Sequence, residues 1–301
     1  MSANKAKKMH RSGFVNIIGN PNVGKSTLMN ALVGEKLSII TSKAQTTRHR
    51  IMGIVSGEDF QIVYSDTPGI LKPSYKLQES MMKFVTGAVT DADVILYVTD
   101  TVEQGDRSAE IIGRIRESGI PTVVVINKID LSTPEALDAL VDKWRQELPE
   151  AQIVPASAKE NFNIEGLFKT ILALLPEGPA FYPKETLTDK TLRFFASEII
   201  REKILKFYDK EIPYCCEIEI ESYKEEPTID RIAATIYVAR DSQKGILIGH
   251  KGEKLKRVGQ TAREDMEQFL GKKVFLQLFV KVSDDWRNNE RQLRRFGYEQ
   301  E

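Results

Sequence analysis

Residues Gly19–Ser26 read Gly-Asn-Pro-Asn-Val-Gly-Lys-Ser, which is a complete phosphate loop of the pattern G-x-x-x-x-G-K-S. The apolar run Phe14–Ile18 before it predicts a short buried strand, and the leucines after it repeat with helical spacing. A strand, a loop and a helix in this order aim backbone N–H groups and a helix N-terminus at phosphate oxygens. The stretch predicts a nucleotide site, with Lys25 at the β- and γ-phosphates and the Ser26 hydroxyl on Mg²⁺. The alternative is a glycine-rich turn that matches by chance.

Length and composition favour a globular protein of about two domains. The chain has 301 residues, of which 41% are hydrophobic and 29% charged, and its net charge is zero. Overall charge therefore indicates no particular partner. Cys215 and Cys216 are neighbours, which we expect on opposite faces of one strand as packing residues, so a disulfide is not expected. No apolar run reaches the roughly 20 residues of a transmembrane helix and no signal peptide is recognisable, so we expect a cytoplasmic protein.

Two apolar runs, Ile51–Val55 and Phe60–Tyr64, predict a hairpin. Before them, Lys43–Arg50 is polar and without helical or strand period, which indicates a loop. The second run leads into Asp66-Thr67-Pro68-Gly69, so a carboxylate stands at a strand end, where open α/β sheets bind ligands. We expect Asp66 to face the metal ion; an ordinary turn is the alternative.

Three further apolar runs alternate with helical patterns and predict strands of a parallel sheet covered on both faces: Val94–Val98, Thr122–Ile126 and Ile153–Pro155. The middle strand ends in Asn127-Lys128-Ile129-Asp130, and the last leads into Ala156-Ser157-Ala158-Lys159. The carboxylate of Asp130 can accept hydrogen bonds from guanine N1–H and N2–H₂, donors that adenine does not present together. Lys128 can pack its stem against the base. The alternative is a polar turn after a strand.

The C-terminal part begins after a proline-rich linker. Its predicted order is helix, two strands, helix, loop, helix and strand. The first helix is Thr191–Tyr208, the strands are Tyr214–Ile220, Arg231–Val238 and Val274–Val282, and the helix after the loop is Glu253–Leu270. Glu217, Glu219 and Glu221 alternate along the first strand, which predicts a solvated acidic face; a metal site is the alternative. Trp286 is expected to be a packing residue rather than a base-stacking one.

A second chemical centre is the G-x-x-G loop formed by Gly249, His250, Lys251 and Gly252. In K-homology domains such a loop lets the backbone approach the sugar–phosphate chain of about four single-stranded nucleotides. A lone G-x-x-G often marks only a turn. Here basic residues surround it, including Lys254, and Ile246–Ile248 precede it as an apolar floor on which bases could lie. We therefore expect RNA binding.

These motifs, in this order, resemble the Era family of GTPases over nearly the whole chain. Thr46-Thr47-Arg48 is similar to the family's first switch and Asp66–Gly69 to its second. The resemblance implies an α/β fold: a P-loop GTPase domain with a mostly parallel sheet, followed by a smaller α+β type II K-homology domain. The implied boundaries are a basic N-terminal tail at 1–12, the GTP-binding domain at 13–176, a linker at 177–189 and the K-homology domain with its C-terminal tail at 190–301. In the tail, Lys5, Lys7, Lys8, His10 and Arg11 are expected to be solvated rather than to form an anion-binding arm.

The resemblance also assigns site residues. Those expected to bind GTP or GDP are Gly19, Asn20, Pro21, Asn22, Val23, Gly24, Lys25, Ser26, Thr27, Thr46, Thr47, Asp66, Thr67, Pro68, Gly69, Asn127, Lys128, Asp130, Ser157 and Ala158. Those expected to hold Mg²⁺ are Ser26, Thr47 and Asp66, although the sequence does not decide between Thr46 and Thr47. Those expected to bind RNA are Gly249, His250, Lys251, Gly252 and Lys254.

Hydrolysis is expected to be slow, because Ile70 stands where Ras-type GTPases carry a water-orienting glutamine. Asn22 matches an asparagine that, in related GTPases, helps hold a monovalent cation beside the phosphates, so K⁺ is an expected cofactor. The alternative is that Asn22 only hydrogen-bonds within the loop. Candidate catalytic residues are Thr47, Asn22 and Lys25.

The resemblance implies a switch protein that binds the single-stranded 3′ end of 16S ribosomal RNA and assists assembly of the 30S subunit. The competing interpretation is a signalling GTPase, peripheral on the inner membrane, whose K-homology domain binds proteins. A kinase or ATPase is disfavoured by the guanine-reading pattern at Asn127–Asp130.

Overall fold

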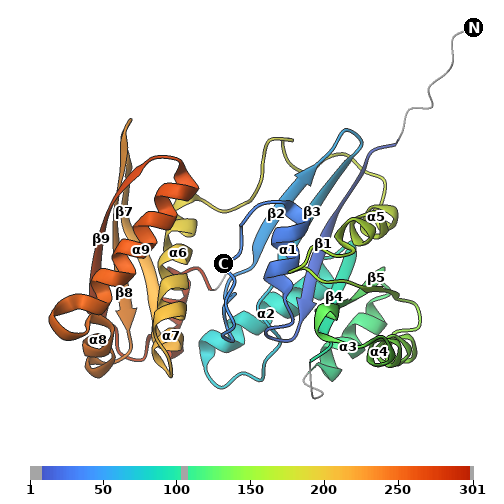
Figure 1. The fold of residues 1–301 in the computed structure, drawn as a ribbon, viewed down its shortest axis with the longest axis horizontal. Helices are drawn as coiled ribbons and strands as arrows, with labels where there is room; N and C mark the ends of the chain where they lie inside the picture. Colours follow the sequence, from blue (N-terminus) through green and yellow to red (C-terminus); the bar gives the residue numbers. More distant parts are fainter. Residues whose placement is uncertain (1–8, 103–107, 299–301) are drawn as a thin grey trace, which may run out of the picture. The chain divides into compact units, whose positions relative to one another are not determined.

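The computed structural model describes residues 9–102 and 108–298 (Figure 1). The chain divides into two compact units. The first comprises Met1–Ser38, Thr47–Lys72 and Met82–Asp189, and the second comprises Ile39–Thr46, Pro73–Met81 and Lys190–Glu301. The second unit therefore contains two short stretches from the N-terminal half of the chain, and one of these ends at Thr46.

The first unit is built on a six-stranded sheet in the order β2-β3-β1-β4-β5-β6. Its strands are β1 (Arg11–Gly19), β2 (Ile51–Ser56), β3 (Phe60–Asp66), β4 (Val94–Asp100), β5 (Thr122–Asn127) and β6 (Gln152–Pro155). Only β2 runs antiparallel to its neighbour, as the predicted hairpin requires. Every residue of β4 and β5 is buried, which explains their unbroken apolar runs, since a strand covered on both faces needs no polar side.

Helices cover this sheet (Figure 1). They are α1 (Lys25–Val33), α2 (Lys76–Thr90), α3 (Ala109–Ser118), α4 (Pro134–Glu147), α5 (Ile164–Leu174) and the 3-10 turn η1 (Ile129–Leu131). One hydrophobic cluster joins α2, α3 and α4 to the sheet through residues such as Val85, Ile112 and Trp144. Helix α1 packs on β1, β2 and β3 and also contacts α5.

The parallel register brings the predicted motifs to one edge of the sheet. Ile17 is paired with Asp66, Gly19 with Val98, and Asp100 with Asn127. The carboxyl ends of β1, β3, β4 and β5 therefore lie level with one another, although the motifs that follow them are far apart in the sequence.

The second unit has a three-stranded sheet in the order β7-β8-β9, in which β7 and β8 are antiparallel and β8 and β9 parallel. Its elements are α6 (Leu192–Phe207), α7 (Ile212–Cys215), β7 (Glu217–Glu225), β8 (Ile229–Val238), α8 (Asp241–Ile248), η2 (His250–Gly252), α9 (Glu253–Leu270), β9 (Lys273–Val282), η3 (Trp286–Asn288) and α10 (Glu290–Arg295). Helices α6 and α9 pack together against the sheet (Figure 1). Their shared core includes Ile200, Ile204, Val258 and Ala262.

Two features of the second unit correct the sequence predictions. The strand predicted from Tyr214 begins only at Glu217, because the preceding residues form a short helix, Ile212–Cys215, with Pro213 in its first turn. Both cysteines are buried and free, in agreement with the packing role, but they do not share a strand. Trp286 is fully buried and donates its indole N–H to the Cys215 carbonyl (2.9 Å), so it is a packing residue.

The predicted solvated glutamate face of β7 is only partly confirmed, because Glu221 is exposed and Glu219 half-buried, whereas Glu217 is buried. Glu217 is only 6% exposed and accepts a hydrogen bond from the Tyr298 hydroxyl (2.6 Å). Glu219 and Glu221 are paired with Arg295 and Lys281. The polar partners come from the C-terminal region, about 60 to 80 residues away, so strand alternation alone could not reveal them.

The predicted tail is also shorter than expected. Strand β1 begins at Arg11, whose guanidinium donates to the Ala173 carbonyl (2.7 Å) near the end of α5. His10 Nδ1 lies 2.8 Å from the Gly178 carbonyl. Arg11 thus satisfies a carbonyl that the last turn of a helix leaves unpaired. The lysines predicted for this tail, at positions 5, 7 and 8, lie outside the described residues.

Candidate functional site

The phosphate loop needs its glycines for space as well as for conformation. A Cβ at Gly24, where φ is +93°, would stand 2.2 Å from Nδ2 of Asn127, and one at Gly19 would stand 2.1 Å from the Val98 carbonyl oxygen. The loop is therefore packed closely against β4 and against Asn127 at the end of β5. Lys25 donates from Nζ to the carbonyls of Gly19 (3.0 Å) and Asn20 (2.8 Å), which places its ammonium group inside the loop.

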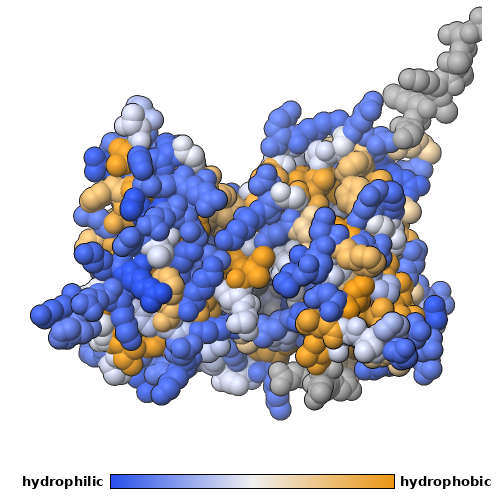
Figure 2. Space-filling model, viewed as in Figure 1, coloured by the Kyte–Doolittle hydropathy of each residue, from blue (hydrophilic) through white to orange (hydrophobic). Residues whose placement is uncertain are grey.

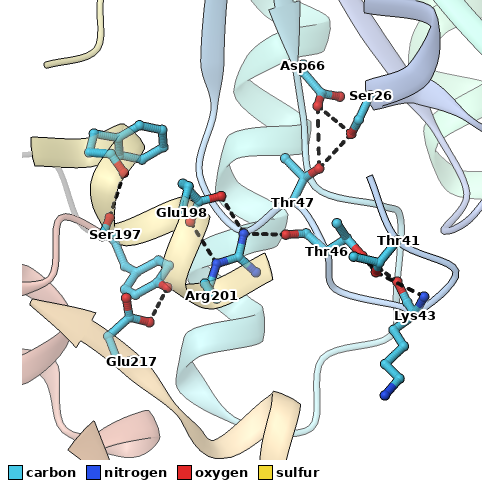
Figure 3. Close-up of polar contacts among 12 residues, drawn as sticks. Ser26, Thr41, Lys43, Thr46, Thr47, Asp66, Ser197, Glu198, Arg201 and Glu217 are labelled. Carbon is cyan, nitrogen blue, oxygen red and sulfur yellow. Dashed lines mark hydrogen bonds and ion pairs between the residues drawn. The ribbon is translucent and has the colours of Figure 1, made fainter. Parts of the chain in front are cut away.

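Three oxygen-bearing side chains meet beside the start of α1 (Figure 3). The Ser26 hydroxyl donates to Oδ2 of Asp66 (2.6 Å) and lies 2.9 Å from the Thr47 hydroxyl, which is itself 3.4 Å from the same carboxylate oxygen. Oδ1 of Asp66 is buried and has no hydrogen-bond partner within the described part of the chain. An all-oxygen donor set with an unsatisfied buried carboxylate oxygen fits Mg²⁺.

Burial raises the pKa of Asp66, and the hydrogen bond from Ser26 and the charge of Lys25 oppose that rise. The side chain has no exposed surface, so its charged form has no access to bulk water. A divalent cation would replace the missing hydration of the carboxylate. This is why a buried aspartate is tenable beside two hydroxyl groups.

The two neighbouring threonines point to different partners. Thr47 is buried and faces Ser26, whereas the Thr46 hydroxyl donates to the Lys43 carbonyl (2.6 Å) and contacts Thr41 (2.6 Å). The geometry favours Thr47 over Thr46 as the threonine beside the metal position, a choice that the sequence left open.

In the second predicted switch, the Thr67 hydroxyl donates to the Ile17 carbonyl (2.7 Å) and anchors the end of β3 to β1. A Cβ at Gly69 would stand 2.8 Å from Cα of Pro21, so this backbone crosses close over the phosphate loop. Ile70 is 3% exposed and packs into the cluster under α2 and α3. The Ile70 side chain is therefore directed into the core. Pro68 lies between Thr67 and Gly69 in the chain.

The residues predicted to recognise the base form one connected network. Asn127 donates to the Val23 carbonyl (2.8 Å) and accepts from the Ala158 N–H (3.0 Å), so it ties the phosphate loop to the last motif. Asp130 is exposed and accepts from the Ser157 hydroxyl (2.5 Å). One carboxylate oxygen is thereby oriented while the side chain remains open to a ligand.

Lys128 bridges two motifs, and one of its partners was missed by sequence reasoning. Its Nζ donates to the Asn22 carbonyl (2.5 Å) and to the carboxylate of Asp100 (2.6 Å), a residue 5% exposed at the end of β4. Asp100 is the last residue of an apolar strand, as Asp66 and Asn127 are of theirs. That shared position was the signal that could have identified it.

Of the remaining predicted loop residues, Asn20 and Val23 are buried, Pro21 lies under Gly69, and Thr27 is in the first turn of α1. Asn22 has φ of +66°, a left-handed conformation that asparagine tolerates better than most residues. The left-handed backbone at position 22 therefore partly explains why an asparagine stands there.

The G-x-x-G loop joins α8 to α9. Gly249, Lys251 and Gly252 all have positive φ, and a Cβ at Gly252 would meet nothing within 4 Å. The backbone at Gly252 is thus open to a ligand, whereas Gly249 lies against the side chain of Lys254. Within the predicted apolar floor, Leu247 is wrong because it is buried in the core, whereas Ile246 is exposed and Ile248 is half-buried.

A groove of about 420 Å³ runs from this loop between α9 and β9. Its lining residues are Gly252, Leu255, Lys256, Gly259, Gln260, Arg263, Leu276 and Leu278. Small and apolar residues form its floor, and basic residues stand along α9. Figure 2 shows mainly hydrophilic residues around the loop at this end of the second unit. Helical spacing along α9 could have identified the groove residues that sequence reasoning missed.

Elsewhere in the described ranges, no group of three or more histidine, cysteine, aspartate or glutamate side chains could hold a metal ion. No helix within those ranges is long and apolar enough to cross a membrane.

Family models match both units. One described as a 50S ribosome-binding GTPase matches residues 14–128, and one described as a KH domain matches residues 211–287. The GTPase Era of Alkaliphilus metalliredigens (strain QYMF) is 46% identical over 295 residues, which are 96% of this chain and 99% of that protein. The GTPase Era of Staphylococcus haemolyticus (strain JCSC1435) is 44% identical over 291 residues, 96% and 97% of the two chains.

Two solved structures are similar over nearly the full length. A crystal structure of Era in complex with MgGDPNP and nucleotides 1506–1542 of 16S ribosomal RNA has a TM-score of 0.93 at 41% identity, covering 97% of this chain and all of that one. A variant of Aquifex aeolicus Era bound to GDP and AlF₄⁻ has a TM-score of 0.92, also at 41% identity, covering 96% and 100%.

Proposed function

Because the chain belongs to the Era family of GTPases, a P-loop GTPase domain followed by a KH domain, we propose that it binds the 3′ end of 16S ribosomal RNA and assists 30S subunit assembly. The observation that carries this proposal is the groove between α9 and β9, which opens at Gly252 in the chain that also holds the nucleotide site. The related Era structure that contains nucleotides 1506–1542 of that RNA supports it.

In the nucleotide site, each residue has a distinct task. Lys25 and the backbone of the phosphate loop would bind the phosphates, and Asp130, oriented by Ser157, would accept from the guanine edge. Ser26, Thr47 and Asp66 would hold Mg²⁺, whose charge offsets that of the phosphates during hydrolysis. Guanine nucleotide and Mg²⁺ are the ligands of the related structure.

The attacking water has no positioning amide at residue 70, since Ile70 is buried in the core. We therefore propose a low intrinsic rate of hydrolysis, and a K⁺ ion beside Asn22 as a partial substitute for a charged catalytic group. An arginine finger contributes about 10³–10⁵ in rate, and we expect less from a hydrated ion.

Turnover in matched potassium and sodium buffers tests the ion. The Asn22→Gly variant removes the side chain and keeps the left-handed backbone without strain, whereas Asn22→Ala adds strain. We expect potassium stimulation in the wild type that both variants lose. Equal rates in both salts for the wild type would contradict the proposal, and stimulation that survives Asn22→Gly would place the ion elsewhere.

Sequencing RNA crosslinked to the full chain in cells tests the RNA partner. We expect reads concentrated at the 3′ end of 16S RNA, and a loss of those reads in a Lys256→Glu variant. A matched Lys206→Glu variant, changed at an exposed lysine of α6 outside the groove lining, should retain them. Crosslinks spread over unrelated RNAs, or equal loss in both variants, would overturn the assignment.

The proposed ribosomal RNA partner also indicates where in the cell the protein acts. Binding to small-subunit RNA supports a place in the cytoplasm, which we propose as the site of action, with peripheral association at the inner membrane as a second location. Cell fractionation followed by immunoblotting of the full chain would test both.

A further inference from the structure

The turn that carries Asp130 starts from a lysine in a left-handed conformation. Lys128 has φ of 60° and ψ of 34° and directly precedes η1, in which Asp130 is the second residue. Lysine seldom adopts this conformation, because its Cβ crowds the neighbouring carbonyl oxygen there. A backbone of this kind persists only where the surrounding structure holds it. The path of the chain into Asp130 therefore depends on the contacts of Lys128.

Two consecutive residues of the first unit hold Lys128 at opposite ends. Asp100, the last residue of β4, accepts from Lys128 Nζ (2.6 Å), and the Thr101 hydroxyl donates to the Lys128 carbonyl (3.0 Å). The same carbonyl accepts from the Leu131 N–H (2.9 Å), which closes the turn. Thr101 thus fastens the main chain of the turn, and Asp100 fastens the side chain that extends from it.

The Asp100 carboxylate is itself held in place. Its side chain is 5% exposed, and its Oδ1 accepts from the Val102 N–H (3.0 Å) while its Oδ2 accepts from Lys128. The register of β4 and β5 pairs Asp100 with Asn127, the residue before Lys128. Water screens a pair with a buried partner less than an exposed pair. The Lys128 side chain remains 30% exposed, so it is anchored at its end and still open to a ligand.

The restraint extends to the phosphate loop, because Lys128 Nζ also donates to the Asn22 carbonyl (2.5 Å). The ammonium group is thereby held at two oxygens from two different segments. Between this end and the turn, the four-carbon stem of the lysine has few rotamers left. A stem ordered in advance loses little conformational entropy when a base packs against it.

We propose that Asp100 and Thr101 are positioning residues for base recognition: Asp100 orders the Lys128 stem against which the base packs, and Thr101 fixes the turn from which Asp130 reaches the guanine edge. This inference rests on the proposed role of Asp130 and on the predicted packing of Lys128 against the base. Without the two contacts, the nucleotide has to order the side chain and the turn as it binds, and that ordering weakens the affinity.

The first test measures GDP binding to the full chain by calorimetry. Asp100→Asn removes the charge and leaves one acceptor oxygen for two donors. We expect GDP affinity to fall about two- to tenfold, the effect of one long side chain that binding has to immobilise. Lys128→Met keeps an apolar stem but has no ammonium group. In that background, Asp100→Asn should change GDP affinity no further, because residues that act through one contact are not additive.

The second test measures selectivity. Thr101→Val removes the hydroxyl at nearly constant volume, and the Lys128 carbonyl keeps its bond from the Leu131 N–H. Inosine diphosphate lacks the N2 amino group of guanine, so the ratio of its dissociation constant to that of GDP reports how well Asp130 is aligned. We expect this ratio to fall about two- to tenfold in Thr101→Val, of the order of one neutral hydrogen bond. A purely structural role of Thr101 would leave the ratio unchanged.

Asp93→Asn is the matched control. Asp93 directly precedes β4, at the opposite end of the strand from Asp100, and accepts from the Phe14 N–H (2.7 Å). The variant should lower stability in urea unfolding and bind GDP and inosine diphosphate as the wild type does. Equal losses of GDP affinity in Asp93→Asn and Asp100→Asn would overturn the positioning role, because the change would then reflect stability alone.

Lys128→Ala and Asp130→Asn separate the two possible failures. If both bind GDP as the wild type does, the proposed base site is wrong. If both weaken GDP binding while Asp100→Asn and Thr101→Val behave as the wild type, the positioning role is overturned. If Asp100→Asn alone does not fold, its combination with Lys128→Met leaves no buried charge unpaired. A loss of GDP affinity in that double variant beyond the loss in Lys128→Met would also overturn the role of Asp100.

Discussion

Asp130 combines an oriented carboxylate with an exposed side chain, since Ser157 donates to one of its oxygens. In Asp130→Asn the amide presents a donor where guanine also donates, whereas xanthine offers a carbonyl oxygen at that position. We expect GDP affinity to fall by about 1.5–3 kcal/mol for each hydrogen bond lost from the charged acceptor, and XDP affinity to rise. Calorimetric titration of both nucleotides measures this. A variant with unchanged GDP affinity and no gain for XDP would refute the assignment of Asp130 to base recognition.

Ile70 is buried, so a simple exchange for glutamine should not create a water-positioning group. In Ile70→Gln, we expect no acceleration of GTP hydrolysis and a loss of about 1–3 kcal/mol in unfolding free energy, because an amide enters an apolar cluster without partners. Ile70→Val is the control, with a smaller loss. Turnover and urea unfolding measure both effects. A faster Ile70→Gln enzyme of normal stability would show that residue 70 can turn toward the nucleotide.

At this scale, the positions of site residues followed from the sequence where a motif defines its own local geometry. Ser26, Asp66 and Asn127 stand at strand ends or loop ends whose backbone geometry follows from local pattern. Asp100 was missed although it ends an apolar strand as Asp66 does. No motif surrounds it, and its partner Lys128 comes from a distant part of the chain.

Among the elements, the loop between α8 and α9 allows a test that separates charge from strain. Gly252 has φ of +79° with open space at its Cβ position, and aspartate and asparagine both tolerate that conformation. We expect Gly252→Asp to abolish binding of a 16S 3′-end oligonucleotide, and Gly252→Asn to weaken it much less, because only the carboxylate repels phosphate. GTP affinity should be unchanged in both.

Fluorescence anisotropy with the labelled oligonucleotide measures this difference. Similar losses in the two variants would mean that the backbone conformation, and not the approach of a charged chain, limits binding. Undiminished binding by Gly252→Asp would remove the loop from the interface.

Elements with a clear period were predicted nearly to their ends, as α9 and β8 illustrate. Two errors fall around the start of β7. The run before it is helical over Ile212–Cys215, and Pro213 was a local signal for that helix which the reading of strand alternation did not use. Glu217 is buried because Tyr298 reaches it from the C-terminal region, a contact that the local sequence does not indicate.

Across the whole molecule, each unit contains one of the two tryptophans: Trp144 in α4 and Trp286 in η3. Single-tryptophan variants, Trp286→Phe and Trp144→Phe, therefore report unfolding of each unit separately. Mg²⁺ with GDPNP at about 100 times the dissociation constant should stabilise the unit that binds it by about 2.7 kcal/mol, seen by Trp144.

Urea unfolding with and without the ligand measures both transitions. An unmoved Trp144 transition would contradict nucleotide binding in the first unit.

The two-domain arrangement itself was predictable from the motifs and the proline-rich linker, but the inclusion of 39–46 and 73–81 in the second unit was not, because it depends on contacts across more than 100 residues.

The hydrogen bond from Arg201 to the Thr46 carbonyl, both of which belong to the second unit, has a consequence for biosynthesis. The Thr46 carbonyl and Arg201 are separated by 155 positions along the chain. At about 5–20 residues per second, roughly 8–30 s pass between the translation of one partner and that of the other. During this interval the nascent N-terminal segment has no helix α6 to attach to, so the order of translation requires the phosphate-loop half to exist with its 39–46 segment still unattached. Completion of the second unit is therefore a late, post-emergence event in the life of each new molecule.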